Sequence, residues 1–386
     1  MDQVKLKYLC TSYSTPITQD QINKNGQYKV YGASGLVGYL PNEGCKTTYL
    51  GIVKDGAGVG RINAYEAGSY LLGTMAYIIP NSGVNIKWLK YAIMSLDLGK
   101  SISKTTIPHI YFSEYSNRKV GWSSLDTQAR IADFLDYKCD EIDSVIAITQ
   151  KTIEEYKALK QSIITEVVTK GIRGDRPMKD SGIEWIGDIP AEWDVVRIKN
   201  LFDYRNERNF KPLEEVNLIS LYTDKGVVQH CDLDETTGNK ASNADGYKLV
   251  YENDIVVNII LCWMGAIGRS AYFGVTSPAY DVYSPKQKTN SKFYHYLFRT
   301  NGFSGDCYKV GRGIMAMRWR TYSDQFRAIK VVSPPQSEQE EIVEYLDEKC
   351  EGIDDLIAKK QQYLTEIENY KKSLIYEYVT GKKEVV

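Results

Sequence analysis

Three short patterns have residue types that could act on a nucleotide or a nucleic acid. Asp55-Gly56-Ala57-Gly58-Val59-Gly60 has the glycines of a nucleotide-binding loop, but no helix-forming run follows it, so a tight hairpin turn is favoured. Asp347-Glu348-Lys349 has a nuclease-like Asp-x-Lys spacing, yet it lies in a helical run without an acidic partner on a strand. Ser333-Pro334-Pro335-Gln336 departs from the Asn/Asp-Pro-Pro-aromatic box of amino-methyltransferases. We therefore expect no catalytic residues and a chain that is not an enzyme.

Cysteine and histidine residues are too scattered to indicate a metal site or a disulfide framework. None of the seven cysteines belongs to a Cys-x-x-Cys pair, and His230-Cys231 is the one His/Cys neighbour pair. We expect this chain to bind no metal and no cofactor. The sequence also has no apolar run near the ~20 residues of a membrane span and no apolar leader stretch, so we expect a cytoplasmic protein.

Basic charge is concentrated in two parts of a chain whose net charge is only −1. Residues 1–123 carry 13 basic and 7 acidic side chains, and residues 286–330 carry 10 and 2. Acidic side chains outnumber basic ones by 9 to 6 in residues 124–172 and by 13 to 7 in residues 335–386. Clustered basic charge is typical of surfaces that contact phosphates, so we expect double-stranded DNA as a partner. On charge alone, a solvated surface with a chance asymmetry is the alternative.

Side chains in these basic parts are suited to reading DNA. Arg can form paired hydrogen bonds with guanine or phosphate, and Gly lets the backbone approach closely. Both occur in Tyr308-Lys309-Val310-Gly311-Arg312-Gly313, whereas residues 100–106 offer Lys and hydroxyl groups. The candidate DNA-binding residues are Lys54, Arg61, Lys100, Lys104, Thr105, His109, Trp263, Arg269, Tyr308, Lys309, Arg312, Arg318, Trp319 and Arg320.

The chain contains an internal repeat. Residues 128–169 align without a gap on residues 339–380, an offset of 211, with 18 identities in 42 positions. The globular parts repeat more weakly: residues 4–9 resemble residues 196–201, and Gly60-Arg61 has a plausible counterpart in Gly268-Arg269. The order along the chain is therefore globular part, helix, globular part, helix.

Both repeated segments have the apolar spacing of long helices. A 42-residue helix would be about 63 Å long and cannot bury its apolar stripe alone, so we expect the two helices to pair. Two separate coiled-coil arms that each meet another protein are the alternative. The expected helix-pairing residues are Ile131, Leu135, Ile142, Ile146, Ile153, Ile342, Leu346, Ile353, Ile357 and Leu364.

These elements predict an α+β protein with a pseudo-two-fold repeat. Two mixed α/β recognition domains would be separated by two long helices that pack as an antiparallel coiled coil. The predicted segments are residues 1–124, the first recognition domain; 125–172, the central helix; 173–335, a linker and the second recognition domain; and 336–386, the C-terminal helix.

Several motifs resemble those of type I restriction-modification specificity subunits. Residues 333–347, Ser-Pro-Pro-Gln-Ser-Glu-Gln-Glu-Glu-Ile followed by Tyr345-Leu346-Asp347, resemble the start of that family's helix, and Val379-Thr380-Gly381-Lys382 resembles its end. Ser181-Gly182-Ile183-Glu184-Trp185-Ile186-Gly187 resembles the segment before the second recognition domain. The first copy departs from the pattern, because Trp122-Ser123-Ser124-Leu125-Asp126 lacks the Pro-Pro pair. This affects the helix cap and leaves the apolar spacing intact.

The resemblance implies sequence-specific DNA recognition in a complex. Each recognition domain would read one half of a bipartite target, while the helices would set the spacer and dock two methyltransferase subunits. S-adenosylmethionine would be bound by the methyltransferase partner, and ATP and magnesium by a restriction/translocase partner if one is present. The alternatives are a non-catalytic coiled-coil scaffold, a solitary DNA-binding protein and a stand-alone DNA methyltransferase.

Overall fold

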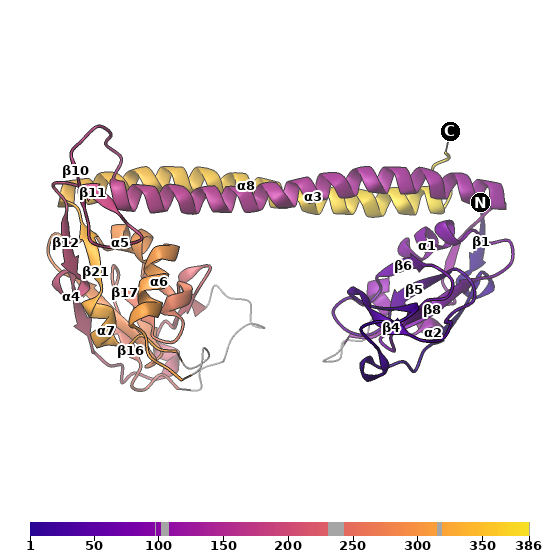
Figure 1. Cartoon of the computed structure of the whole chain (residues 1–386), viewed down its shortest axis with the longest axis horizontal. Coiled ribbons are helices and arrows are strands. Elements are labelled where there is room, and N and C mark those ends of the chain that lie inside the picture. Colours follow the sequence, from indigo (N-terminus) through magenta and orange to yellow (C-terminus); the bar gives the residue numbers. More distant parts are fainter. Residues whose placement is uncertain (97, 102–107, 231–242, 315–318, 386) are drawn as a thin grey trace. The chain divides into compact units, whose positions relative to one another are not determined.

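The computed structural model describes residues 1–96, 98–101, 108–230, 243–314 and 319–385. Contacts divide the chain into unit 1, which comprises Met1–Thr152 with Lys359–Val386, and unit 2, which comprises Ile153–Ala358. Each unit combines one globular part with a portion of both long helices, α3 (Leu125–Lys170) and α8 (Gln336–Val379) (Figure 1). The four segments expected from the sequence stay a prediction, because the contacts group the residues into two units instead.

The globular part of unit 1 is built on a four-stranded antiparallel sheet in the order β2-β8-β5-β6. A β4-β3-β7 sheet and a β1-β9 pair accompany it. Its elements are β1 (Asp2–Lys5), η1 (Leu6–Tyr8), β2 (Cys10–Ser14), η2 (Gln19–Gln21), β3 (Tyr28–Gly32), β4 (Gly35–Leu40), β5 (Tyr49–Val53), β6 (Ile62–Tyr65), β7 (Tyr70–Leu71), β8 (Met75–Pro80), α1 (Ile86–Met94), η3 (Leu98–Ser101), α2 (Phe112–Tyr115) and β9 (Lys119–Trp122).

The globular part of unit 2 repeats this plan with the sheet β13-β20-β17-β18. Strand pairs β12-β21, β10-β11, β14-β15 and β16-β19 surround it. Its elements are β10 (Met178–Asp180), β11 (Asp188–Pro190), β12 (Asp194–Arg197), α4 (Ile198–Leu201), β13 (Phe202–Arg205), η4 (Leu213–Glu215), β14 (Ile219–Tyr222), β15 (Gly226–Gln229), β16 (Lys248–Val250), β17 (Ile255–Asn258), η6 (Cys262–Met264), β18 (Ile267–Arg269), β19 (Gly274–Thr276), β20 (Tyr280–Pro285), α5 (Ser291–Phe298), α6 (Asn301–Val310), α7 (Ser323–Ala328) and β21 (Lys330–Ser333).

In unit 1 a small set of polar contacts joins the globular part to α3. The Asn85 side chain accepts a hydrogen bond from the backbone of Trp88 and so caps α1, since the first N–H groups of a helix lack partners within it. Gln128 of α3 accepts from Asn85 N at 2.9 Å. Eight residues further along α3, Asp136 accepts a hydrogen bond of 2.7 Å from the Tyr91 hydroxyl. The N-terminal cap of α1 and the face of α1 that carries Tyr91 are therefore both bound to α3.

Unit 2 repeats these contacts on α8. Asn290 caps α5, and Gln339 accepts from Asn290 N at 2.9 Å. The Tyr296 hydroxyl donates to Asp347 at 2.7 Å. Gln339 and Asp347 lie 211 residues after their counterparts, whereas Asn290 and Tyr296 lie 205 residues after theirs. The repeat is therefore one of contacts as well as of sequence.

Within each unit α3 and α8 run side by side in opposite directions (Figure 1). The start of α3 shares an apolar cluster with the end of α8 in unit 1, and the reverse holds in unit 2. Most of the expected helix-pairing residues are buried, namely Ile131, Leu135, Ile142, Ile153, Ile342, Leu346 and Ile353. The others, Ile146, Ile357 and Leu364, are partly buried. The predicted fold class, two mixed domains with an antiparallel helix pair, is confirmed.

Candidate DNA interface

In unit 1 three predicted contact residues meet at the β5–β6 loop. Ile110 N donates to Lys54 O at 2.9 Å, and Gly56 N donates to Pro108 O at 2.9 Å, so the chain around His109 lies along this loop. The Lys54 ammonium pairs with Asp55 at 3.3 Å, and Arg61 is exposed at the end of the loop. The hairpin turn predicted for residues 55–60 is confirmed, because β5 and β6 are antiparallel neighbours.

The other predicted residues of unit 1 fall at the margin of this surface. Lys100 belongs to η3, whereas Lys104 and Thr105 lie outside the described residues. Tyr111 was not predicted, although its ring lies 5.0 Å from that of His109 and its side chain is 53% exposed. Its place two residues after His109 was the available signal, since alternate residues of an extended chain share a face.

Unit 2 presents the equivalent surface at the β17–β18 loop. Thr321 N donates to Ile259 O at 2.9 Å, which matches the contact of Ile110 with Lys54 in unit 1. Trp263 lies in this loop, in η6, and its ring is 5.7 Å from that of Tyr308 at the end of α6. Met264, which follows Trp263 and is 53% exposed, is a neighbour that the sequence analysis did not select.

A short hairpin adjoins this surface. Arg312 and Arg320 pair through two backbone hydrogen bonds, of 2.8 and 2.9 Å, and both side chains are exposed. The Trp319 ring stacks on Tyr308 with centroids 4.9 Å apart. Arg318 lies outside the described residues. Five predicted residues, Trp263, Tyr308, Arg312, Trp319 and Arg320, thus come together in unit 2.

Two predicted residues of unit 2 are engaged elsewhere. Arg269 donates through Nε and Nη2 to Asn253 Oδ1, at 2.9 and 2.6 Å. Lys309 forms an ion pair of 3.0 Å with Glu184, which lies between β10 and β11. Both side chains therefore have structural partners within unit 2.

The suggested match between Gly60-Arg61 and Gly268-Arg269 is wrong. Ile62 and Ile267 begin β6 and β18 in the same register, which makes Gly60 the counterpart of Gly265. The two glycines have φ angles of 87° and 86°, a conformation that favours Gly. Arg269 pairs with the first residue of β17 and so lies at the end of β18 away from the loop.

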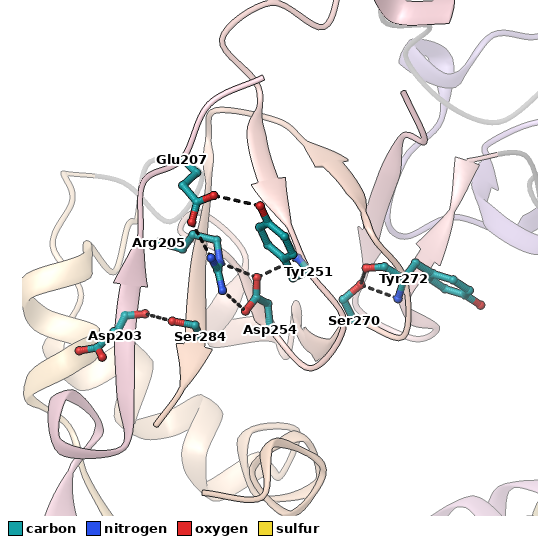
Figure 2. A network of polar contacts seen from close by, with 8 residues as sticks. All are labelled: Asp203, Arg205, Glu207, Tyr251, Asp254, Ser270, Tyr272 and Ser284. Carbon is teal, nitrogen blue, oxygen red and sulfur yellow. Dashed lines mark hydrogen bonds and ion pairs between the residues drawn. The ribbon is translucent and has the colours of Figure 1, made fainter. Parts of the chain in front are cut away.

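A charged network holds the start of β17, which leads into the β17–β18 loop (Figure 2). Arg205 Nε and Nη2 donate to the two oxygens of Asp254 at 2.8 and 3.2 Å, and Arg205 Nη1 donates to Glu207 at 2.6 Å. The guanidinium also lies over the Tyr251 ring. Burial raises the pKa of the Asp254 carboxyl, and the bonds from Arg205 oppose this shift.

The described residues contain no group of three or more His, Cys, Asp or Glu side chains that could hold a metal ion. Of the neighbour pair noted in the sequence, His230 is described and Cys231 is not. No helix in the described ranges is long and apolar enough to cross a membrane.

Comparison with known proteins gives a consistent result. The model of the type I restriction modification DNA specificity domain matches residues 190–368. The type I restriction enzyme MjaVIII specificity subunit of Methanocaldococcus jannaschii is 26% identical over 317 residues, 76% of this chain and 70% of that protein. The putative type I restriction enzyme MjaX specificity subunit of the same organism is 27% identical over 300 residues, 74% of this chain and 62% of that protein.

Structural similarity extends over the whole chain. A chain from a solved structure concerned with complex assembly and conformational transition of the type I R-M system has a TM-score of 0.69 at 12% identity, covering 99% of this chain and 98% of that chain. The matched domain is a DNA specificity domain, and both of these relatives are named as specificity subunits of type I restriction enzymes. This chain is similar to type I restriction-modification specificity subunits over about three quarters of its length.

Proposed function

We propose that the chain reads a bipartite DNA target without catalysing a reaction, and that each unit reads one half. The main support is the equivalence of two surfaces. The bond from Ile110 to Lys54 in unit 1 and the bond from Thr321 to Ile259 in unit 2 place the same kind of loop beside the same extended segment. Basic and aromatic side chains suited to phosphates and base edges lie at both places.

The candidate contact residues differ between the two surfaces. Unit 1 offers Lys54, Arg61 and His109, whereas unit 2 offers two arginines beside three aromatic rings. Side chains of different hydrogen-bonding capacity select different base edges, so the two half-sites should differ in sequence.

The helix pair would act as the spacer and as the docking surface for partners. Because α3 and α8 both enter both units, they would set the distance between the half-sites, as protein geometry does in dimeric DNA-binding proteins. Two methyltransferase subunits would dock on the repeated helices and bind S-adenosylmethionine. ATP and magnesium would belong to restriction/translocase subunits, if these join the complex.

The direct test is selection from randomised duplex DNA with the chain co-expressed with its methyltransferase subunit, at a defined salt concentration. A two-part motif with a fixed gap is expected. An uninterrupted motif, or none from an assembled complex, would favour a scaffold role and contradict the proposal. Replacing residues 1–124 by those of a relative should then change one half of the motif and leave the other half as it was.

A further inference from the structure

Arg312 and Arg320 lie directly opposite each other at the base of the hairpin in unit 2. Each backbone N–H donates to the carbonyl oxygen of the other residue. Residues that exchange both bonds have Cα atoms about 5.5 Å apart, and their side chains lie on the same face. The two guanidinium groups therefore leave the hairpin side by side.

Trp319 determines which face of the hairpin these arginines occupy. Neighbouring side chains of an extended strand point to opposite faces, so Trp319 and Arg320 face opposite ways. The Trp319 Nε1–H donates to Tyr308 O at 3.1 Å, and the indole stacks on the Tyr308 ring with an interplanar angle of 23°. A Cβ on Gly311 would lie 2.3 Å from Trp319 Nε1, so a glycine is needed there. Trp319 thus anchors one face and leaves the arginine face exposed.

The arginine pair has no compensating contact in the part of the chain that the structure describes. Neither Arg312 nor Arg320 makes a side-chain hydrogen bond or an ion pair with a described residue. By contrast, the guanidinium groups of Arg205, Arg269 and Arg299 in the same unit all donate to acceptors. Like charges directly opposite on a strand pair destabilise it. Such an arrangement favours a ligand rich in hydrogen-bond acceptors.

We propose that Arg312 and Arg320 each read a guanine in the half-site that unit 2 contacts. The inference rests on the proposed function, because it requires unit 2 to bind DNA. Guanine presents N7 and O6 acceptors on its major-groove edge, and the fork of one guanidinium matches both. Phosphate oxygens could also accept from Arg, but they carry no base information. A contact with guanine and a contact with phosphate predict different effects on binding.

The experiment uses the full chain in complex with its methyltransferase subunit and the motif selected with the wild type. Arg312→Ala and Arg320→Ala should each weaken binding to the guanine-containing site about ten- to a hundred-fold. Affinity for sites that have another base in place of the guanine contacted by the substituted arginine should change much less. Arg320→Lys keeps the charge but removes the planar fork, so it should weaken the preference for guanine. Lys330→Ala removes one exposed positive charge from unit 2 as a matched control and should leave the motif unchanged.

Replacing the guanine by 7-deazaguanine, which lacks the N7 acceptor, separates the two sources. The wild type should bind this DNA more weakly, and the variant that has lost the contact should show no further loss. A uniform loss for all sequences, a salt slope smaller by about 1 and no effect of 7-deazaguanine would indicate a phosphate contact and overturn the inference. A second half-site without guanine would also overturn it. A wild-type complex without any two-part motif would instead refute the proposed function, and this inference with it.

Discussion

Lys160 on α3 contacts Asp354 on α8, with 2.6 Å between Nζ and Oδ2. The same pair occurs 211 residues along the repeat, where Lys371 contacts Asp143 at 2.6 Å. The first contact lies in unit 2 and the second in unit 1. Because the acid and the base exchange helices between the two contacts, each unit has the register expected for two copies that pack antiparallel.

Exchange of the charges at this contact tests the register. Asp354→Lys places two ammonium groups together and should lower the free energy of unfolding, whereas adding Lys160→Asp should restore it. Asp354 is 58% exposed, so solvent screening should limit the effect to about 0.2–1 kcal/mol. Urea denaturation of the two single variants and the double variant gives the coupling. Additive effects would mean that the two side chains do not interact in solution.

The network around Arg205 should contribute more to stability, because it satisfies a buried carboxylate (Figure 2). The Asp254 side chain is 1% exposed, and Arg205→Ala would remove the guanidinium that bonds both its oxygens. We expect a loss of about 3 kcal/mol in the free energy of unfolding, since one partner of a buried pair is left uncompensated. Asp254→Asn in the same chain removes the stranded charge and should recover part of the loss. No recovery in the double variant would point to lost packing on Tyr251.

The sequence predicted the two long helices well, because apolar spacing along a helix depends only on residues that are close in the sequence. Apolar spacing and the offset of 211 residues identified both helices and the residues between them, including Leu135 and Leu346, which are fully buried. The attachment of the globular parts was not predictable from that offset. Asn85 and Asn290 are 205 residues apart while their partners are 211 apart, so insertions and deletions change the correspondence between contact and sequence.

Residue types suggested candidate contacts with DNA, but the sequence did not predict where these residues lie in the fold. Arg269 follows a glycine near a strand as Arg61 does, yet strand register places it at the opposite end of its strand. The opposition of Arg312 and Arg320 depends on two backbone hydrogen bonds between residues eight positions apart. Such pairing comes from the tertiary fold, and no spacing in the sequence specifies it.

Acid should destabilise unit 2 through His295. Burial and then the nearby positive charge of Arg299, Arg269 and Lys292 lower the pKa of His295 to about 3, and its Nδ1 accepts from Arg269 N at 3.1 Å. Since the unfolded histidine has a pKa near 6.5, the unfolded state binds the proton first as the pH falls. The resulting loss in the free energy of unfolding is absent above about pH 7 and should reach about 2 kcal/mol at pH 5.

Substitution of this histidine separates its share of the acid sensitivity. His295→Gln should remove the corresponding part of the slope of unfolding free energy against pH between 7 and 4. His109→Gln serves as the matched control, because His109 lies in unit 1, whereas His295 lies in unit 2. Urea denaturation at several pH values measures both. An unchanged slope for His295→Gln would show that the ring binds its proton over the same pH range in the folded and the unfolded state.

Acidic side chains on α8 should support docking of the methyltransferase subunits. Glu344, Glu348 and Glu351 are exposed and lie at helical spacing on one face in unit 2. Replacing all three by Lys reverses the local charge without removing an apolar contact of the helix pair, so folding should persist while assembly weakens several-fold. The matched control replaces the exposed Glu214 and Glu215, which lie in η4, by Lys. Mass measurement of the co-expressed complex compares the two variants: equal assembly would exclude this face of α8 from docking, whereas weaker assembly of the α8 variant alone would locate one docking surface.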